Sequence, residues 1–330
     1  MNRPGVPAPG FVKRIGPVVD ARRETVFQEL QSVELVNRLK PGPDGSGMPF
    51  GWTVNPFRGC EIGCTYCYAR PTHEYLGHSD PEEFESRVYV KRADPVRLLE
   101  SLRRARASGQ EVAIGTATDP YQPAEGRFRV TRDVLRAVAQ VRGLRVGLTT
   151  KGVSVTRDLE LLQEIAAASE LTVNVSLISL DAELLRLLEP RAARPDLRIG
   201  AIRTLASSGI ATRLFLMPIL PFITDAEHGL RDLLHAAREA GAREAVWNVL
   251  FLRGSARDFY LGFVKREFPW LSARYEALYA RGTRAEGDYR EAVERLVERL
   301  ARESGLAGLT REDRVRREAP ARQSQLELVW

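Results

Sequence analysis

Three cysteines carry the most specific chemical signal in this sequence. Cys60, Cys64 and Cys67 are the only cysteines among 330 residues, and they stand in the spacing C-x3-C-x2-C. An odd number of clustered thiols does not indicate a disulfide framework, and thiolates are soft ligands that suit iron–sulfur clusters or zinc. A [4Fe–4S] cube normally takes four cysteines. Three would leave one iron open, so the loop predicts a cluster that binds a reacting molecule.

A zinc site is the alternative that these residues leave open. His73 follows the last cysteine in the spacing C-x5-H and could complete a Cys3His set. Structural zinc sites usually combine a C-x2-C unit with a distant second pair of ligands, whereas this loop holds a single C-x2-C unit. His78, His228 and His235 form no metal-binding pattern, and we assign no acid–base role to any histidine. An iron–sulfur cluster is therefore the preferred prediction.

The composition bounds the class of protein. The chain carries 49 Lys and Arg against 43 Asp and Glu, which gives a formal net charge of +6. Only five of these basic residues are lysines, and the excess is spread along the chain, whereas a nucleic-acid site would concentrate charge on one face. No apolar run is long enough to cross a membrane, and the N-terminus lacks the apolar core of a signal peptide. We expect a cytoplasmic protein with a solvated, arginine-rich surface.

The elements that must position the cysteines alternate regularly between strands and helices. Glycines at 109, 143, 209 and 241 follow four of the helical patterns. This alternation implies right-handed βαβ units and a parallel sheet. Six units are too few for a closed eight-fold barrel, so an α/β fold is predicted, either a partial (βα)6 TIM-like barrel or an open doubly wound sheet. The strand candidates are 52–55, 111–117, 144–150, 171–179, 211–218 and 243–252.

Three regions follow from this pattern. Residues 1–47 form an N-terminal extension, in which Thr25 to Leu39 could form a short amphipathic helix. Residues 48–254 contain the six strands of the partial barrel. Residues 255–330 turn helical and form a helical C-terminal region and tail, which would cover the barrel or close its open side.

Several sequence blocks resemble a known family. The pattern C-x3-C-x-φ-C, with Tyr66 before the last cysteine, resembles the signature of the radical S-adenosylmethionine superfamily. A subgroup similar to spore photoproduct lyase shares further blocks, and its members are often labelled DNA-repair-lyase-like and mostly have no assigned substrate. The shared blocks, which fall between about residues 46 and 280, are NPFRGC, CYARPTHEYLG, GTATDPYQPAE, TTKG, LEPRA and PILPFITD.

The resemblance implies a radical enzyme on a partial (βα)6 barrel. Cys60, Cys64 and Cys67 would hold a [4Fe–4S] cluster whose open iron binds S-adenosyl-L-methionine. A reductant such as flavodoxin or ferredoxin would supply one electron. Cleavage would give methionine and a 5′-deoxyadenosyl radical that abstracts hydrogen from an unknown substrate, with nucleic acid as an open choice. The cofactor carries this chemistry, and the protein binds and orients it.

The resemblance also assigns cofactor-binding residues at the carboxyl ends of strands, where the active sites of such barrels gather. Thr118 and Asp119 would accept hydrogen bonds from the methionine ammonium, since an ammonium needs acceptors. Lys151 would meet the methionine carboxylate as a point cation. Both assignments have structural alternatives, because Asp119 precedes a proline and suits a turn, and Lys151 could be a solvated lysine at a strand end.

Two further residues complete the predicted cofactor site. Ser176 lies in an apolar strand and would serve the ribose or the carboxylate, or else be a satisfied core serine. Arg191, in the LEPRA block, would contact the carboxylate or the substrate, or else form an ion pair with Glu189. Both assignments leave the structural alternative open.

Two tyrosines flank Cys67, and the resemblance places Tyr66 beside the adenine and Tyr68 near the base of the loop. A radical relay through Tyr66 and Tyr68 is left open. Spore photoproduct lyase uses a fourth cysteine after its second strand as a hydrogen donor, and Thr116 stands at the corresponding place here. A hydroxyl is a poor hydrogen-atom donor, so repair by that route is not expected. The alternative functions are a non-enzymatic iron–sulfur or zinc-binding sensor and a nucleic-acid-binding protein.

Overall fold

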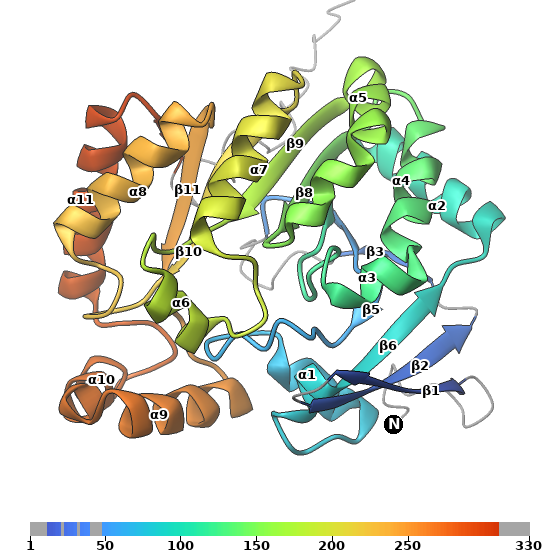
Figure 1. Ribbon diagram of the computed structural model, residues 1–330. Helices are drawn as coiled ribbons and strands as arrows, with labels where there is room; N and C mark the ends of the chain where they lie inside the picture. Colours follow the sequence, from blue (N-terminus) through green and yellow to red (C-terminus); the bar gives the residue numbers. More distant parts are fainter. Residues whose placement is uncertain (1–11, 21–22, 32–33, 40–47, 310–330) are drawn as a thin grey trace, which may run out of the picture.

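The computed structural model describes residues 12–20, 23–31, 34–39 and 48–309, which form two β-sheets and their covering helices (Figure 1). The larger sheet has eight strands in the order β12-β11-β10-β9-β8-β7-β4-β3. Its six central strands are mutually parallel, and each lies beside its successor in the chain. They are β4 (Trp52–Val54), β7 (Val112–Ile114), β8 (Arg145–Thr150), β9 (Glu170–Ser176), β10 (Ala211–Ile219) and β11 (Glu244–Val249).

The six predicted strands are therefore confirmed, and so is the partial (βα)6 architecture. Two short strands that the sequence did not predict extend the sheet. β3 (Val36–Arg38) pairs antiparallel with β4 at one edge, and β12 (Ala307–Leu309) pairs parallel with β11 at the other. These two edge strands do not pair with each other, so the sheet does not close into a barrel within the described part of the chain.

Helices connect the strands, and Figure 1 shows several of them along the outside of the large sheet. The start of α2 shows why the sequence folds this way: the side chain of Asp94 accepts hydrogen bonds from two backbone N–H groups of the first turn, and Pro95 occupies a position that needs no donor. Its end is set by Gly109 with φ +66°. The outer helices are α2 (Pro95–Ser108), α4 (Val130–Ala139), α5 (Leu159–Ala168), α7 (Pro195–Ser207) and α8 (Glu227–Glu239).

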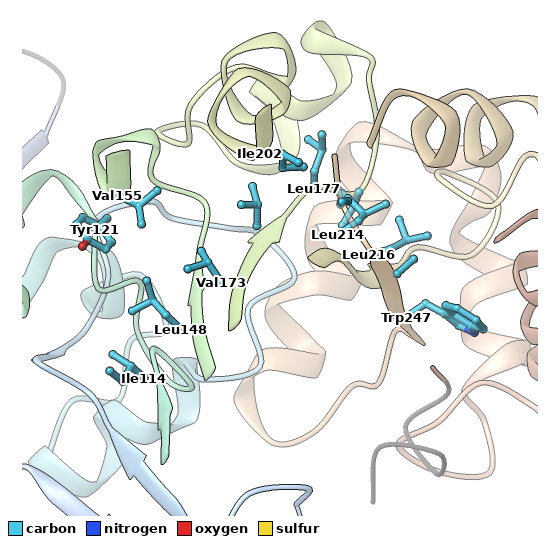
Figure 2. Packing of buried hydrophobic residues seen from close by; sticks show 14 of the residues in the cluster. Ile114, Tyr121, Leu148, Val155, Val173, Leu177, Ile202, Leu214, Leu216 and Trp247 are labelled. Atoms are coloured by element: carbon cyan, nitrogen blue, oxygen red, sulfur yellow. The ribbon is translucent and has the colours of Figure 1, made fainter. Parts of the chain in front are cut away.

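The two faces of the sheet differ in polarity. Fully buried side chains such as Leu148, Val173 and Leu214 pack against the helices on the outer face (Figure 2). The opposite face carries a row of directly paired polar residues across β8, β9, β10 and β11, namely Thr149, Asn174, Arg213 and Glu244. Since side chains alternate along a strand, Lys151 and Ser176 fall on this polar face as well. These two of the predicted cofactor residues thus lie on the inner side of the open barrel.

The second sheet holds part of the N-terminal extension, in the order β1-β2-β6-β5, where β5 is Phe57–Arg58. The helix expected from Thr25 to Leu39 is wrong: β2 (Arg23–Gln31) and β3 occupy this segment. Thr25 and Phe27 are buried while Val26 and Gln28, which follow them, are half-buried, so residues 25–28 show the two-residue period of a strand. Pairing with β1 (Val12–Asp20) and β6 (Arg87–Arg92) outweighs its local helical pattern.

The C-terminal region is helical, as predicted, up to β12. α11 packs against α8 and β11, and α9 packs against η1 (Arg70–Leu76), the turn that follows the cysteines. The C-terminal helices thus lie partly on the sheet edge and partly beside the cysteine loop. The predicted tail at 310–330 lies outside the described residues, and the boundaries at 47 and 254 stay predictions. The helices are α9 (Ser255–Glu267), α10 (Ser272–Leu278) and α11 (Gly287–Glu303).

Two further points concern the helices. α4 begins at Val130 without a side-chain cap, and the hydroxyl of Thr131 in its first turn donates to the carbonyl oxygen of Pro120 over 2.5 Å. Among the residues that the structure describes, no helix combines the length and the apolar character needed to cross a membrane.

The packing of the outer face makes a prediction about stability. Leu148 is 0% exposed at the centre of the core, so Leu148→Ala should lower the free energy of unfolding by about 2–5 kcal/mol, measured by urea titration. The matched control is Leu197→Ala on α7, where the leucine is 51% exposed, and the expected change is within about 0.5 kcal/mol. Equal losses for both variants would contradict the assignment of Leu148 to the core.

Candidate active site

The cysteine loop follows β4 and turns sharply at two glycines. Gly59 has φ +86°, and a Cβ there would approach the carbonyl oxygens of Arg87 and Phe84 to 2.6 and 2.9 Å. Only glycine fits this position, because both contacts are with backbone atoms. Gly63 has φ +69° and allows the chain to turn again between the first and second cysteines. The backbone N–H of Cys60 donates to the Phe84 carbonyl oxygen over 2.9 Å and fixes the start of the loop.

The three thiols fit an iron–sulfur cluster by their chemistry. All are free cysteines on one loop; Cys60 is buried, and Cys64 and Cys67 are half-buried. Burial raises the pKa of the Cys60 and Cys64 thiols, that of Cys64 to about 12. Both are therefore protonated in the free protein, and ligand formation must release their protons.

The arrangement of ligands does not suit a single metal ion. Within the described ranges, no three His, Cys, Asp or Glu side chains converge on a site for one ion. A cube bonds each thiolate to a different iron and so spaces the sulfurs more widely than one ion does. Nε2 of His73 lies 2.9 Å from the Arg87 carbonyl oxygen, and its ring packs on Phe84 and Tyr89. The alternative Cys3His zinc site with His73 is not formed.

Lys151 and Ser176 meet at the carboxyl ends of β8 and β9. The Lys151 ammonium donates to the Ser176 hydroxyl over 2.9 Å and lies 5.8 Å from the centre of the Tyr66 ring. Burial alone would lower the pKa of Lys151, but Cys64 in its thiolate form and the Glu189 carboxylate raise it more, and the net shift is upward. The side chain is therefore an ammonium beside the cysteine loop and not a fully solvated lysine. Ser176 is 2% exposed and hydrogen-bonded, as a satisfied core serine would be, and the predicted contacts of both residues with the cofactor stay predictions.

A buried ion pair lies behind this lysine. Glu189 is 1% exposed, and one of its carboxylate oxygens accepts hydrogen bonds from the Tyr66 hydroxyl and lies 3.8 Å from Lys151 Nζ. The other carboxylate oxygen pairs with Arg198 on α7, which is equally buried. Burial alone would raise the pKa of Glu189, but Arg198 and Lys151 lower it more, so the carboxylate is ionised.

Arg191 contacts the cysteine loop between the first two cysteines. Its backbone N–H donates to the Ile62 carbonyl oxygen over 3.3 Å, and its guanidinium to the Glu61 carbonyl oxygen over 3.4 Å. The ion pair considered between Arg191 and Glu189 is not formed, because Glu189 pairs with Arg198. Arg191 therefore supports the loop between the first two cysteines, and its predicted contact with the cofactor or substrate stays a prediction.

Thr118 and Asp119 follow β7 and bond to the protein around the site. The Thr118 hydroxyl donates to the Gly59 carbonyl oxygen over 2.7 Å. Asp119 accepts hydrogen bonds from the Thr150 hydroxyl and the Lys151 backbone N–H, both at 2.6 Å. Burial raises the pKa of Asp119, and these hydrogen bonds lower it in part. The two residues hold the cysteine loop and the end of β8 together, and their predicted contact with the methionine ammonium stays a prediction.

Gln122 also holds the cysteine loop through hydrogen bonds. It is 1% exposed, and its Oε1 accepts a hydrogen bond from the Glu61 backbone N–H at 2.8 Å. Its Nε2 donates to the Gly59 carbonyl oxygen at 3.2 Å and to the Thr118 hydroxyl at 3.0 Å. The Glu61 carboxylate in turn accepts from the backbone N–H of Ala124 at 2.6 Å. The backbone on both sides of Cys60 is thus held by side-chain hydrogen bonds.

The two tyrosines of the loop differ in exposure. Tyr66 is buried, whereas Tyr68 is 48% exposed, and its ring lies 5.6 Å from the ring of Phe251 beyond β11. The Tyr68 hydroxyl donates to the Thr116 carbonyl oxygen. Asn55 fixes that segment, because its Nδ2 donates to the Thr116 hydroxyl at 3.0 Å and its Oδ1 accepts from a backbone N–H at 2.8 Å. A radical relay through the tyrosines stays a prediction.

Sequence reasoning missed several residues of this site. Gln122 lies in the block GTATDPYQPAE and Glu189 in LEPRA. Both blocks therefore contain residues that support the site in addition to the predicted cofactor-binding residues. Arg198 left a stronger signal. It lies on the apolar stripe of α7, where Ala201, Ile202 and Leu205 are buried three, four and seven positions further on. An arginine at such a position predicts a buried acidic partner.

Comparison with known proteins identifies the family. The family model described as the Radical SAM superfamily matches residues 54–250. The uncharacterized protein Rv2578c of Mycobacterium tuberculosis (strain H37Rv) is 36% identical over 306 residues, which cover 92% of this chain and 88% of that protein. The uncharacterized protein MJ0683 of Methanocaldococcus jannaschii is 27% identical over 177 residues, with 54% and 63% covered.

The fold is similar to solved structures of spore photoproduct lyase. The structure of that enzyme complexed with dinucleoside spore photoproduct matches with a TM-score of 0.64 at 13% identity, over 86% of this chain and 81% of that chain. The chain belongs to the Radical SAM superfamily. Members of this superfamily are enzymes that use a [4Fe–4S] cluster and S-adenosylmethionine and that need a reductant.

The hydrogen bonds of Gln122 make a prediction about cluster loading. Gln122→Leu leaves the Gly59 carbonyl oxygen and the Glu61 N–H without that partner, which costs about 1–3 kcal/mol for a buried polar group. The loop should loosen, and iron retained after anaerobic reconstitution should fall. The control is Gln163→Leu on α5, where the glutamine is exposed and bonds only to the Ser208 carbonyl oxygen. Full iron retention in Gln122→Leu would contradict this role.

Proposed function

We propose that this chain is a radical enzyme in which Cys60, Cys64 and Cys67 hold a [4Fe–4S] cluster and bound S-adenosylmethionine is the source of the radical. The observation that carries the proposal is the ammonium of Lys151, held at the carboxyl end of the sheet beside the cysteine loop. When bound, the cluster and its cofactor supply a 5′-deoxyadenosyl radical that abstracts hydrogen from a substrate.

The residues of this chain would bind and orient the cofactor. Lys151 would meet the methionine carboxylate, because an ammonium has three donors and only one is used by Ser176. Ser176 would share that carboxylate or a ribose hydroxyl through its remaining hydrogen-bonding capacity. Tyr66 packs its ring beside the ammonium and would border the adenine. Thr118 and Asp119 would hold the loop and the strand end at a fixed spacing around the ligand.

An enzyme explains this site better than a sensor does. A sensor needs its cluster and a way to report its state, whereas it has no use for an ammonium and a hydroxyl at neighbouring strand ends. Lys151 and Ser176 are held together by a 2.9 Å hydrogen bond, backed by the Glu189–Arg198 pair. Such an arrangement fits a ligand with a carboxylate.

The substrate and partners are proposed only in outline. A soluble electron carrier of the flavodoxin or ferredoxin type would supply the reductant in the cytoplasm. Spore photoproduct lyase has been solved with a dinucleoside photoproduct, which makes nucleic acid the substrate class to test first. Thr116 occupies the place where a thiol would be expected for hydrogen return, and this argues for a different reaction outcome. A steep loss of DNA affinity with salt would support a nucleic-acid substrate.

The cysteine ligands can be tested by metal content. Anaerobically reconstituted protein should hold about four iron per chain with broad visible absorption, and Cys64→Ala should lose this iron because one iron has no thiolate. The matched control is Thr65→Ala, since the neighbouring Thr65 hydroxyl is buried without a hydrogen-bond partner among the described residues. Stoichiometric zinc without acid-labile sulfide would overturn the proposal.

Lys151 separates cofactor binding from cluster assembly. A charge-assisted hydrogen bond in a partly buried site contributes about 1.5–3 kcal/mol, so Lys151→Ala should weaken S-adenosylmethionine binding about ten- to a hundred-fold. Iron content should not change, because Lys151 is no ligand. Lys265→Ala on α9 is the control, since that lysine is exposed. Affinity would be measured by equilibrium dialysis of the reconstituted proteins, and an unchanged value for Lys151→Ala would show that the cofactor site is wrong at this position.

A further inference from the structure

Glu189 is the point where three separate elements meet. Its carboxylate accepts a hydrogen bond from Tyr66 on the cysteine loop, lies 3.8 Å from Lys151 Nζ at the end of β8, and pairs with Arg198 on α7. The carboxylate is completely shielded from solvent. A buried charge is costly unless it is paired and hydrogen-bonded. Here the compensating groups are Tyr66, Lys151 and Arg198, and the first two belong to the proposed cofactor site.

Arg198 prevents this carboxylate from turning away. Its Nε donates to the Ala193 carbonyl oxygen over 2.6 Å, and its Nη1 donates to the Ser176 carbonyl oxygen over 3.0 Å. The remaining nitrogen holds Glu189. Because a guanidinium is planar and its donors are fixed in direction, these three contacts fix Glu189 relative to the end of β9, where Ser176 bonds Lys151.

Two cations share the Glu189 carboxylate unequally. Arg198 and Glu189 form a contact pair and neutralise each other. Lys151 is too far from Glu189 for a direct hydrogen bond at 3.8 Å, and its ammonium donates to a neutral hydroxyl instead. Lys151 keeps 15% of its side chain exposed. The pair thus attracts the ammonium without bonding to it directly, and among the described residues Ser176 takes one of the three donors, which leaves two for an anionic group.

We propose that Glu189 is a positioning residue of the cofactor site, which holds the Lys151 ammonium and the Tyr66 ring at fixed places before the cofactor binds. This inference rests on the proposed function of Lys151. It assigns to Glu189 and Arg198 a role that acts through other residues, because every polar atom of both side chains already has a partner among the described residues.

The test compares two buried carboxylates. Glu189→Gln keeps the shape of the side chain and removes its charge. Glu125→Gln is the matched control, because Glu125 is 0% exposed, accepts backbone hydrogen bonds at 2.9 and 3.1 Å and lies 3.6 Å from Arg157, a guanidinium. Both proteins are reconstituted anaerobically, and iron per chain, thermal unfolding midpoint and S-adenosylmethionine affinity are measured.

Both variants should keep about four iron per chain and both should unfold at a lower temperature than the parent protein. Glu189→Gln alone should weaken S-adenosylmethionine affinity, by about tenfold if the loss is that of one oriented charge contact. A structural ion pair would lower the unfolding midpoint without this loss of affinity. Unchanged affinity in Glu189→Gln, or an equal loss in Glu125→Gln, would overturn the proposal.

A double-mutant cycle shows whether Glu189 acts through Lys151. In the Lys151→Ala background, Glu189→Gln should weaken affinity by about threefold or less, because only the Tyr66 ring is left of the two groups that it orients. A full further tenfold loss would overturn the inference. If Lys151→Ala alone leaves affinity unchanged, the proposed function fails at this site. If Lys151→Ala weakens affinity and Glu189→Gln does not, only the role of Glu189 fails.

A second variant covers the case in which Glu189→Gln does not fold. Arg198→Lys keeps the positive charge but loses the fixed fork of donors, so Glu189 would no longer be tied to Ser176 through one rigid group. Affinity should fall about three- to tenfold with iron content retained. An unchanged affinity in folded, iron-loaded Arg198→Lys would count against the proposal on its own.

Discussion

The structure around the site depends on the hydrogen bonds of an irregular loop that is partly buried. Between β4 and η1 the chain has almost no regular secondary structure, so its polar backbone groups cannot be satisfied within the loop itself. Side chains and backbone from other elements supply the partners. Gln122 and Thr118 reach the Gly59 carbonyl oxygen from beyond β7, and the Thr65 N–H donates to the carbonyl oxygen of Leu188 after β9. The strands of the open barrel therefore act as a frame that holds three thiols in place.

The same set of contacts explains how Lys151 and Arg198, two cations, can lie close together near the site. A lysine beside a buried arginine would be strongly destabilising if both were uncompensated. Glu189 neutralises Arg198 and leaves Lys151 with its charge directed towards the inner face of the sheet. The neighbouring thiols become anionic ligands only when they bind metal, so the site gains negative charge beside the Lys151 ammonium at that stage. The charges around the site are therefore better balanced when the thiolates hold a metal cluster than when no metal is bound.

The regular part of the fold could be predicted because it follows local rules. Helix ends at Gly109 and the apolar strands were visible in short windows of sequence. The N-terminal strands could not be predicted, because β2 is stabilised by pairing with β6, about sixty residues away. The cysteines were visible through their spacing. The supporting residues were not, because Glu189 meets Tyr66 across 123 positions and Gln122 meets Glu61 across 61. Such contacts exist only once the strands have been brought side by side.

The open edge of the barrel gives the C-terminal helices a role at the cysteine loop. Arg70, which follows the last cysteine, is 1% exposed, and one of its nitrogens donates to the Cys64 carbonyl oxygen over 2.9 Å and to Glu85 over 2.7 Å. Its guanidinium stacks over the ring of Phe259 on α9 at 4.0 Å. The guanidinium is planar and pre-organised, so it loses less side-chain entropy for each hydrogen bond that it forms. Arg70 therefore links the backbone of Cys64 to α9. A displacement of α9 would change the position of the cysteine loop through this side chain.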